Sequence, residues 1–229
     1  MVETWIFDLD NTLYPAGSGL FGQVEERILG YIERHLGLSR EKAQELRRRY
    51  FKEHLTTLRG LILNDGIDAA DFLDFVHDID LSVLAPDAAL DRSLADLPGR
   101  KAIFTNASAA HAENVLARLG LARHFEFIFD IQAADFVPKP DIAIYRRLCL
   151  AHGIHPEKAA LIDDMERNLV PAHDLGMTTI LVKSAADRIE EAEYIHHMTD
   201  NLAAFLAAGD DNPAAFPAAG GTTGKETET

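Results

Sequence analysis

Short apolar runs alternate with helical patterns along much of this sequence, and that alternation limits the possible fold more than any other feature. The first run lies at residues 3–8, and the alternation resumes at residue 101. Strands that alternate with helices pair in parallel, through right-handed crossovers. The runs expected to be strands are residues 3–8, 102–105, 125–129, 159–162 and 178–182, with a short extended piece near Tyr194 and Ile195. The sequence therefore predicts an α/β fold built on one parallel sheet.

A long helical stretch separates the first predicted strand from the second. Its apolar residues recur at helical spacing, and Ser39 and Asp68 are candidate N-caps. Helices are expected at about residues 21–36 and 41–54, after Asp68, and from near Pro86. We expect residues 15–95 to form an inserted helical subdomain and residues 1–14 and 96–208 to form the α/β core. Residues 209–229 are poor in large apolar side chains and are predicted to be a disordered tail.

The charge balance narrows the possible partners. The chain has 37 acidic and 22 basic residues, a formal net charge of −15, which disfavours nucleic acid polymers and anionic membrane surfaces. Its single cysteine, Cys149, excludes an internal disulfide and a cysteine-based zinc site. With neither a signal-like leader nor a membrane-length apolar run, a cytoplasmic protein is expected. The sequence leaves monomer and homodimer open.

Polar residues follow the ends of the predicted strands. In a parallel sheet these ends share one edge, where ligands bind. Four carboxylates gathered there would favour a hard cation such as Mg²⁺ over zinc. Thr105 and the backbone N–H of Asn106 can donate to phosphate oxygens, and Lys139 can neutralise a phosphate. The residues at these ends are Asp8, Asp10, Thr105, Asn106, Lys139, Asp163 and Asp164.

Each of these residues also has an ordinary structural interpretation. Asp8 and Asp10 could belong to an Asx-type turn, and Lys139 could be a solvated loop residue between two prolines. Thr105 could simply close a strand, and the Asp163 pair could be helix N-terminal charges. A shared site requires only that one sheet edge collects them, whereas the ordinary interpretations require several coincidences.

Four short motifs contain these residues. They resemble the signature motifs of the haloacid dehalogenase-like superfamily, in the same order, and the resemblance covers the chain to about residue 207. They are Asp8-Leu9-Asp10-Asn11-Thr12, Thr105-Asn106, Lys139-Pro140 and Ile162-Asp163-Asp164. The resemblance implies a Rossmann-like core with a helical cap. It also implies that Asp8 is the nucleophile that forms an aspartyl-phosphate. Asp10 would be the general acid and then the base, with its backbone carbonyl on Mg²⁺.

The same resemblance assigns the remaining roles. Thr105 and Asn106 would bind the phosphoryl oxygens, and Lys139 would offset their charge and tether Asp8. Asp163 and Asp164 would complete the Mg²⁺ site, with Asp164 favoured as the direct ligand and Asp163 as a direct or water-mediated one. Asn168 would orient a metal-bound water, although a polar residue in the first helical turn is an equal alternative.

The second carboxylate favours phosphatase over dehalogenase activity, because a halide leaving group needs no proton. Within the superfamily, residues 7–15 most resemble the pyrimidine 5′-nucleotidase group, which implies UMP or CMP as substrate. A sugar phosphate, phosphoglycolate or another small phosphate ester, a phosphomutase, and a non-catalytic binding module remain alternatives. Arg59 and His77 could reach the substrate or be surface or capping groups. Aromatic residues in and beside the inserted helices could stack on a base, but helical spacing favours a core role (Tyr14, Tyr50, Phe51, Phe72 and Phe75).

Overall fold

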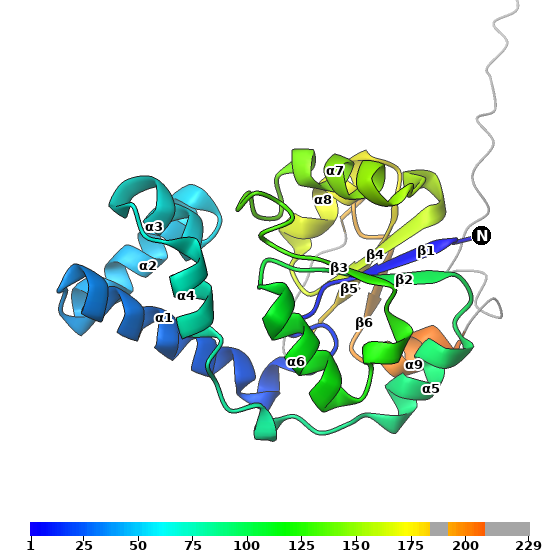
Figure 1. Ribbon diagram of the computed structural model, residues 1–229. Coiled ribbons are helices and arrows are strands. Elements are labelled where there is room, and N and C mark those ends of the chain that lie inside the picture. The colour runs from blue at the N-terminus through cyan, green and yellow to red at the C-terminus, as the bar shows by residue number, and fades with distance from the viewer. Residues whose placement is uncertain (184–191, 209–229) are drawn as a thin grey trace, which may run out of the picture.

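The computed structural model describes residues 1–183 and 192–208, which contain a parallel sheet with helices on both faces (Figure 1). Its six strands lie in the order β3-β2-β1-β4-β5-β6, and every neighbouring pair is parallel. This confirms the predicted α/β fold. The strands are β1 (Thr4–Phe7), β2 (Arg100–Phe104), β3 (Phe127–Phe129), β4 (Ala159–Asp163), β5 (Thr178–Val182) and β6 (His197–Thr199).

The register brings the predicted strand ends to one edge. Phe7 pairs with Ile103 on one side and with Ile162 on the other. The residues that follow these three positions therefore emerge side by side at the carboxyl edge. Asp8 continues the alignment, since its backbone N–H donates to the carbonyl of Ile162 at 2.8 Å.

Alternate side chains of the strands pack on opposite faces of the sheet. Phe7 belongs to the apolar cluster beneath α5 (Ala88–Asp96), α6 (Ala109–Leu119) and α9 (Leu202–Ala207). Ile6 belongs to the cluster under α7 (Ile142–His152) and α8 (Glu166–Asp174). Figure 1 shows these two helix groups on either side of the strands.

The inserted segment forms a separate helical layer, which we call the cap. It consists of α1 (Leu20–Leu36), α2 (Arg40–His54), α3 (Thr57–Asp65) and α4 (Ala69–Val76), with an apolar cluster of its own. Figure 1 shows it beside the sheet, next to α6. The expected caps are present, because Ser39 and Asp68 accept hydrogen bonds from the first turns of α2 and α4.

Helix α3 was not among the helices expected from the sequence. Helix α2 ends just before Leu55, which has a left-handed φ of 72° although it is not a glycine. Thr56 then caps α3. Gly60 is required inside α3, because a Cβ there would lie 2.3 Å from the Tyr50 ring. A break made by leucine carries no compositional signal, which explains the omission.

Two other elements differ from expectation. Helix α5, which the pattern placed in the inserted segment, packs against α9, and its Leu90 and Leu94 are buried with sheet residues. The extended piece expected at Tyr194 and Ile195 is wrong by a few residues, since β6 begins at His197. The tail predicted for residues 209–229 lies outside the described residues.

Short 3-10 helices occur in the connections at Ala16–Ser18, Leu81–Val83, Ala122–His124 and Pro156–Lys158. Among the helices of the described residues, none is both long and apolar enough to span a bilayer.

Candidate active site

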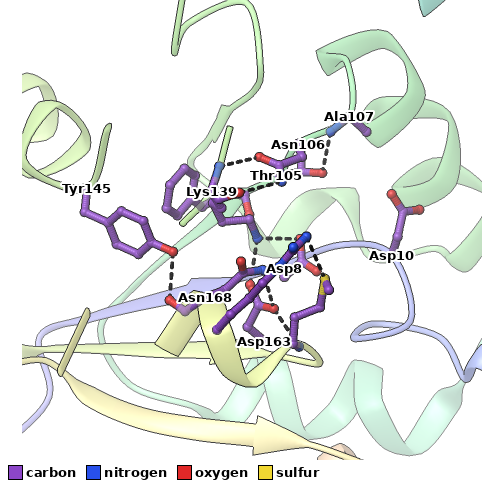
Figure 2. Close-up of polar contacts among 12 residues, drawn as sticks. Asp8, Asp10, Thr105, Asn106, Ala107, Lys139, Tyr145, Asp163 and Asn168 are labelled. Atoms are coloured by element: carbon purple, nitrogen blue, oxygen red, sulfur yellow. Dashed lines mark hydrogen bonds and ion pairs between the residues drawn. The ribbon is translucent and has the colours of Figure 1, made fainter. Parts of the chain in front are cut away.

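Lys139 is the centre of the group at the carboxyl edge of the sheet (Figure 2). Its Nζ donates to Asp8 Oδ1 at 2.8 Å, to Asp163 Oδ2 at 2.7 Å and to the carbonyl of Phe104 at 2.9 Å. The side chain is 1% exposed, so the interpretation as a solvated loop residue is wrong. Three acceptors satisfy all three ammonium protons, as a buried lysine requires.

Burial and mutual repulsion dominate the electrostatics of this group. Burial raises the pKa of Asp8 well above its usual value, and the charges of Asp163 and Asp164 raise it further against the opposing effect of Lys139. Burial lowers the pKa of Lys139, but the two carboxylates that it contacts outweigh this effect, and the net pKa is raised. The group therefore has an excess of negative charge that one ammonium does not neutralise.

The residues present fit a hard divalent cation. Oxygen atoms of Asp8, Asp163 and Asp164 lie within 4.8 Å of one another. Burial and the charge of Asp163 raise the pKa of Asp164 to about 7, a repulsion that a cation would relieve. In the part of the chain that the structure describes, Oδ1 of Asn11 and Oδ1 of Asn168 are buried without a hydrogen-bond partner. Such oxygens are suitable acceptors for metal-bound water.

Asp163 and Asp164 differ in how far their oxygens are already occupied. Asp163 Oδ1 accepts from the backbone N–H of Met165 and from Nδ2 of Asn168, both at 2.9 Å, and its Oδ2 accepts from Lys139. Asp164 is the less buried of the two. The Asp164 carboxylate is thus the freer of the two to bind a cation, and its role as the direct ligand stays a prediction. Asn168 is 2% exposed, and its amide orients Asp163.

The side chain of Asp10 does not join the other carboxylates. The motifs predict four carboxylates together, and three come together. Figure 2 shows the Asp10 carboxylate apart from the group around Lys139. Its Oδ1 accepts from the hydroxyl of Tyr14 at 2.5 Å and from Nε2 of His111 at 3.1 Å. Burial raises the pKa of Asp10, but the bonds from His111 and Tyr14 outweigh burial and hold it below its usual value.

Thr105 and Asn106 join the β2 end to the Lys139 loop. Asn106 Oδ1 accepts from the backbone N–H of Lys139 at 2.8 Å, so the amide side chain holds that loop in place. Thr105 is 2% exposed, and its Oγ1 accepts from the N–H of Ala107 at 3.0 Å. The Asn106 side chain is therefore a structural tie, and its backbone N–H is the group that the sequence analysis expected on phosphate.

A cavity of about 450 Å³ lies between this group and the cap. Its floor includes Asp8, Asp10 and Lys139, and its walls are largely apolar. Phe21 and Phe51 line it and are 38% and 42% exposed. Other wall residues come from the cap helices, among them Val24, Ile28, Leu58, Phe72, Leu73 and Val76.

Two arginines at the cavity have incomplete hydrogen bonding. Arg47 donates to Glu25 at 2.7 Å, and Arg167 donates to the carbonyl of Leu55 at 3.3 Å and lies 4.4 Å from the Phe51 ring centre. Within residues 1–183 and 192–208, the Nε atoms of both arginines are buried without a partner. Arg167 comes from α8 and contacts the end of α2, so it also bridges core and cap.

Comparison with known proteins agrees with this geometry. A family profile described as "haloacid dehalogenase-like hydrolase" matches residues 2–176. The chain belongs to this family. Phosphate metabolism protein 8 of Saccharomyces cerevisiae is 29% identical over 197 residues, which are 78% of this chain and 61% of that protein. The chain thus spans about three fifths of the length of this relative.

A second relative is matched over nearly its whole length. Glyceraldehyde 3-phosphate phosphatase of Methanothermobacter thermautotrophicus is 25% identical over 210 residues, 86% of this chain and 91% of that protein.

Solved structures share the fold of this haloacid dehalogenase-like hydrolase. An HAD phosphatase from Thermococcus onnurineus superposes with a TM-score of 0.62 at 17% identity, over 90% of this chain and 95% of that one. A 2-haloacid dehalogenase from Pseudomonas syringae gives a TM-score of 0.58 at 20% identity, over 91% and 99%. Phosphatases and dehalogenases thus share this architecture, and the fold alone does not choose between them.

The structure adds two residues to the site that the motifs did not identify. Tyr14, for which the sequence leaves core packing and base stacking open, is buried, and its hydroxyl contacts Asp10. His111 was not considered at all. One signal was available: His111 lies in the first turn of the helix that follows Thr105 and Asn106, at the same sheet edge.

The remaining candidates divide between core and site. Tyr50 and Phe72 are buried in the cap, as the core interpretation predicted, whereas Phe51 is exposed at the cavity. Arg59 Nη1 lies 3.5 Å from the carbonyl of Phe136, a contact between cap and core. His77 lines the cavity and stacks on His111.

Proposed function

We propose that this chain is a Mg²⁺-dependent phosphomonoester hydrolase that acts through an aspartyl-phosphate on Asp8. The observation that carries the proposal is the buried group in which Lys139 contacts both Asp8 and Asp163 on the floor of the cavity. A second carboxylate, Asp10, also reaches that cavity and is held by different residues. The phosphatase names carried by homologues support the same reaction class.

The proposed reaction has two steps. An oxygen of Asp8 bonds to phosphorus while the bond from phosphorus to the ester oxygen breaks, and that oxygen takes a proton from Asp10. Water then attacks the phosphorus of the aspartyl-phosphate and gives a proton to Asp10, which frees Asp8 and releases inorganic phosphate. A halide leaving group would need no proton, so the presence of Asp10 favours phosphatase over dehalogenase.

The other residues bind the phosphoryl group and neutralise negative charge. Thr105 and the backbone N–H of Asn106 hold the phosphoryl oxygens, and Lys139 offsets charge on the nucleophile. Asp8, Asp164 and the backbone carbonyl of Asp10 would hold Mg²⁺, with Asp163 completing the site directly or through water. When bound, the cation neutralises the phosphoryl oxygens during transfer. Asn168, through its bond to Asp163 and its free Oδ1, would orient a metal-bound water.

We further propose a pyrimidine nucleoside 5′-monophosphate, UMP or CMP, as the preferred substrate. The apolar cavity walls and the exposed ring of Phe51 suit a flat base, in keeping with the resemblance of residues 7–15. The second candidate is a smaller phosphate ester, favoured by the relative named as a glyceraldehyde 3-phosphate phosphatase. In either case the partner is a small molecule.

The test is release of phosphate from a panel of esters, with Mg²⁺ or with a chelator. The panel holds UMP, CMP, dUMP, AMP, phosphoglycolate, glyceraldehyde 3-phosphate and sugar phosphates. We expect Mg²⁺-dependent release, fastest from UMP and CMP, with one labelled oxygen entering phosphate in H₂¹⁸O. Faster release from a small ester would retain the chemistry and overturn the nucleotide assignment. Transfer to a sugar instead of water would identify a mutase, and no turnover would reopen the binding-module interpretation.

A further inference from the structure

Asp10 is held by a buried cluster that lies apart from the group around Lys139. His111 contributes Nε2 at 3.1 Å and Tyr14 contributes its hydroxyl at 2.5 Å, and both contact Oδ1 of Asp10. The His111 side chain is 1% exposed, so this ring is a component of the interior. Nε2 of His111 is the donor in this contact, because Oδ1 of an ionised Asp10, or of one protonated on Oδ2, only accepts hydrogen bonds.

The His111 ring is itself fixed by a residue from the cap. It stacks on His77 with 4.2 Å between ring centres and 18° between ring planes. His77 follows the last residue of α4, and its Nδ1 lies 3.0 Å from Oγ of Ser108, the N-cap of α6. The same hydroxyl oxygen accepts from the backbone N–H of His111 at 3.3 Å. Core and cap together therefore fix the plane of this ring.

The two donors leave one oxygen of Asp10 unused. Both bind Oδ1, and Oδ2 accepts no hydrogen bond from any of the described residues, although Asp10 lines the cavity. A carboxylate fixed through one oxygen cannot rotate without breaking two hydrogen bonds. Proton transfer requires the other oxygen within about 2.6–3.2 Å of the reacting atom, a distance that a free side chain rarely holds.

We propose that His111 is a positioning residue that, with Tyr14, holds Oδ1 of Asp10 so that Oδ2 exchanges the proton with the substrate oxygen. This inference rests on the proposed function, which makes Asp10 the general acid and base. His111 does not contact the reacting atoms, so it acts only through the two proton transfers of Asp10, to the leaving oxygen and from the attacking water.

The leaving group provides the test. p-Nitrophenyl phosphate releases a weakly basic phenolate that needs little protonation, whereas an alkyl ester such as UMP releases a strongly basic alkoxide. kcat/KM covers the steps through cleavage of the ester bond. In His111→Leu we expect kcat/KM for UMP to fall on the order of 10²-fold, and for p-nitrophenyl phosphate by less than about tenfold. If UMP is not turned over, the fastest alkyl ester of the panel replaces it.

Two further variants keep the test decisive. His111→Gln places an amide N–H near the position of Nε2 and should restore much of the lost alkyl-ester activity. Tyr14→Phe removes the other donor to the same oxygen and should shift the ratio of the two esters in the same direction. If His111→Leu does not fold, which thermal unfolding reveals, Tyr14→Phe tests the same clamp.

His124 supplies a matched control. Its side chain is also little exposed, at 7%, and contacts a carboxylate, with 2.7 Å from Nε2 to Oδ1 of Asp91, but it lines a hollow at the start of β2 together with Met1 and Arg100. His124→Leu should change kcat/KM for both esters by the same factor, because a loss of folded enzyme acts on all substrates alike.

A spectroscopic measurement tests the geometry without turnover. Nitrogen-15 NMR of the histidine rings should find His111 protonated on Nε2 at neutral pH, with the signal identified by its absence from His111→Gln. A His111 ring protonated on Nδ1 alone, or equal loss for both esters in His111→Leu, overturns the inference. Failure of the proposed function is distinguishable from this outcome. It would appear as absent phosphate release by the unmodified protein, or as activity of the Asp8→Asn variant.

Discussion

The two sides of the cavity are built differently. On the core side, Lys139 is buried and gives its three protons to fixed acceptors. On the cap side, the walls are largely apolar, Phe21 and Phe51 are partly exposed, and Arg47 retains a partnerless Nε among the described residues. A group whose hydrogen bonds are all made to fixed partners can hold one chemical moiety, such as a phosphoryl group, in one geometry. An apolar wall selects by size and shape, which suits a variable leaving group.

The same contrast appears in how the two parts are joined. The cap has an apolar cluster of its own, to which the core contributes Ile131. Polar contacts between cap and core include Arg167 with the Leu55 carbonyl and Arg59 with the Phe136 carbonyl. We therefore expect substitutions in the group around Lys139 to lower the turnover of all esters alike, and substitutions at the cap wall to lower the turnover of some esters more than others.

The largest effect is expected from Asp8→Asn. The amide is not a nucleophile at phosphorus, so turnover should fall on the order of 10⁴-fold or more for every ester in the panel. Circular dichroism and thermal unfolding should show that the fold persists, because the amide oxygen still accepts from Lys139. Substantial activity of this variant toward any ester would contradict the mechanism.

Lys139→Met should cost both activity and stability. It removes the cation between Asp8 and Asp163 and leaves two buried carboxylates facing each other, which destabilises by about 3–5 kcal/mol. Urea denaturation without divalent cations measures this loss. Asp8→Asn introduced together with Lys139→Met should recover part of it, because the repulsion is then smaller. A double variant no more stable than Lys139→Met alone would mean that charge repulsion is not the cause.

Phe51→Ala tests the cap wall. Removing a ring that stacks on a base costs about 1–3 kcal/mol, so kcat/KM for UMP should fall roughly tenfold or more. For phosphoglycolate, which has no base, the change should be small. Leu63→Ala is the matched control, because Leu63 is 62% exposed on cap helix α3 and does not line the cavity. An equal fall for both esters would remove the distinction between the two walls.

The last effect is the pH dependence of stability at the contact between cap and core. Burial lowers the pKa of His77 to about 3, with a further contribution from His111. Between that value and the unfolded pKa of about 6.5, the unfolded chain binds a proton that the folded chain does not. This residue's contribution to stability is therefore complete above that window and is lost as pH falls through it, by up to about 1.4 kcal/mol per pH unit.

His77→Phe keeps a ring on His111 and removes the titrating group. Urea denaturation at several pH values between 4 and 7 should give the variant a smaller slope of unfolding free energy against pH. Identical slopes would show that His77 is accessible to protons in the folded protein.

Local sequence patterns were sufficient to predict most of the fold. The strand runs and the caps at Ser39 and Asp68 could be predicted because apolar periodicity and capping chemistry operate over a few residues. The break at Leu55 could not be predicted, since a left-handed leucine is held by its surroundings and leaves no mark in the composition. Helix α5 was wrongly assigned to the inserted segment because of its position in the chain. The helix on which it packs, α9, lies about a hundred residues away.

The sequence by itself determined which groups lie at the carboxyl edge, because parallel strands bring their ends together whatever their order. Tertiary structure alone decided the direction of each side chain. Lys139 comes from a loop and is buried because Asp8, just after β1, and Asp163, at the end of β4, contact it. The side chain of Asp10 lies apart from them, where His111, 101 residues along the chain, supplies a donor. Such contacts depend on how separate elements pack, and a linear pattern does not encode them residue by residue.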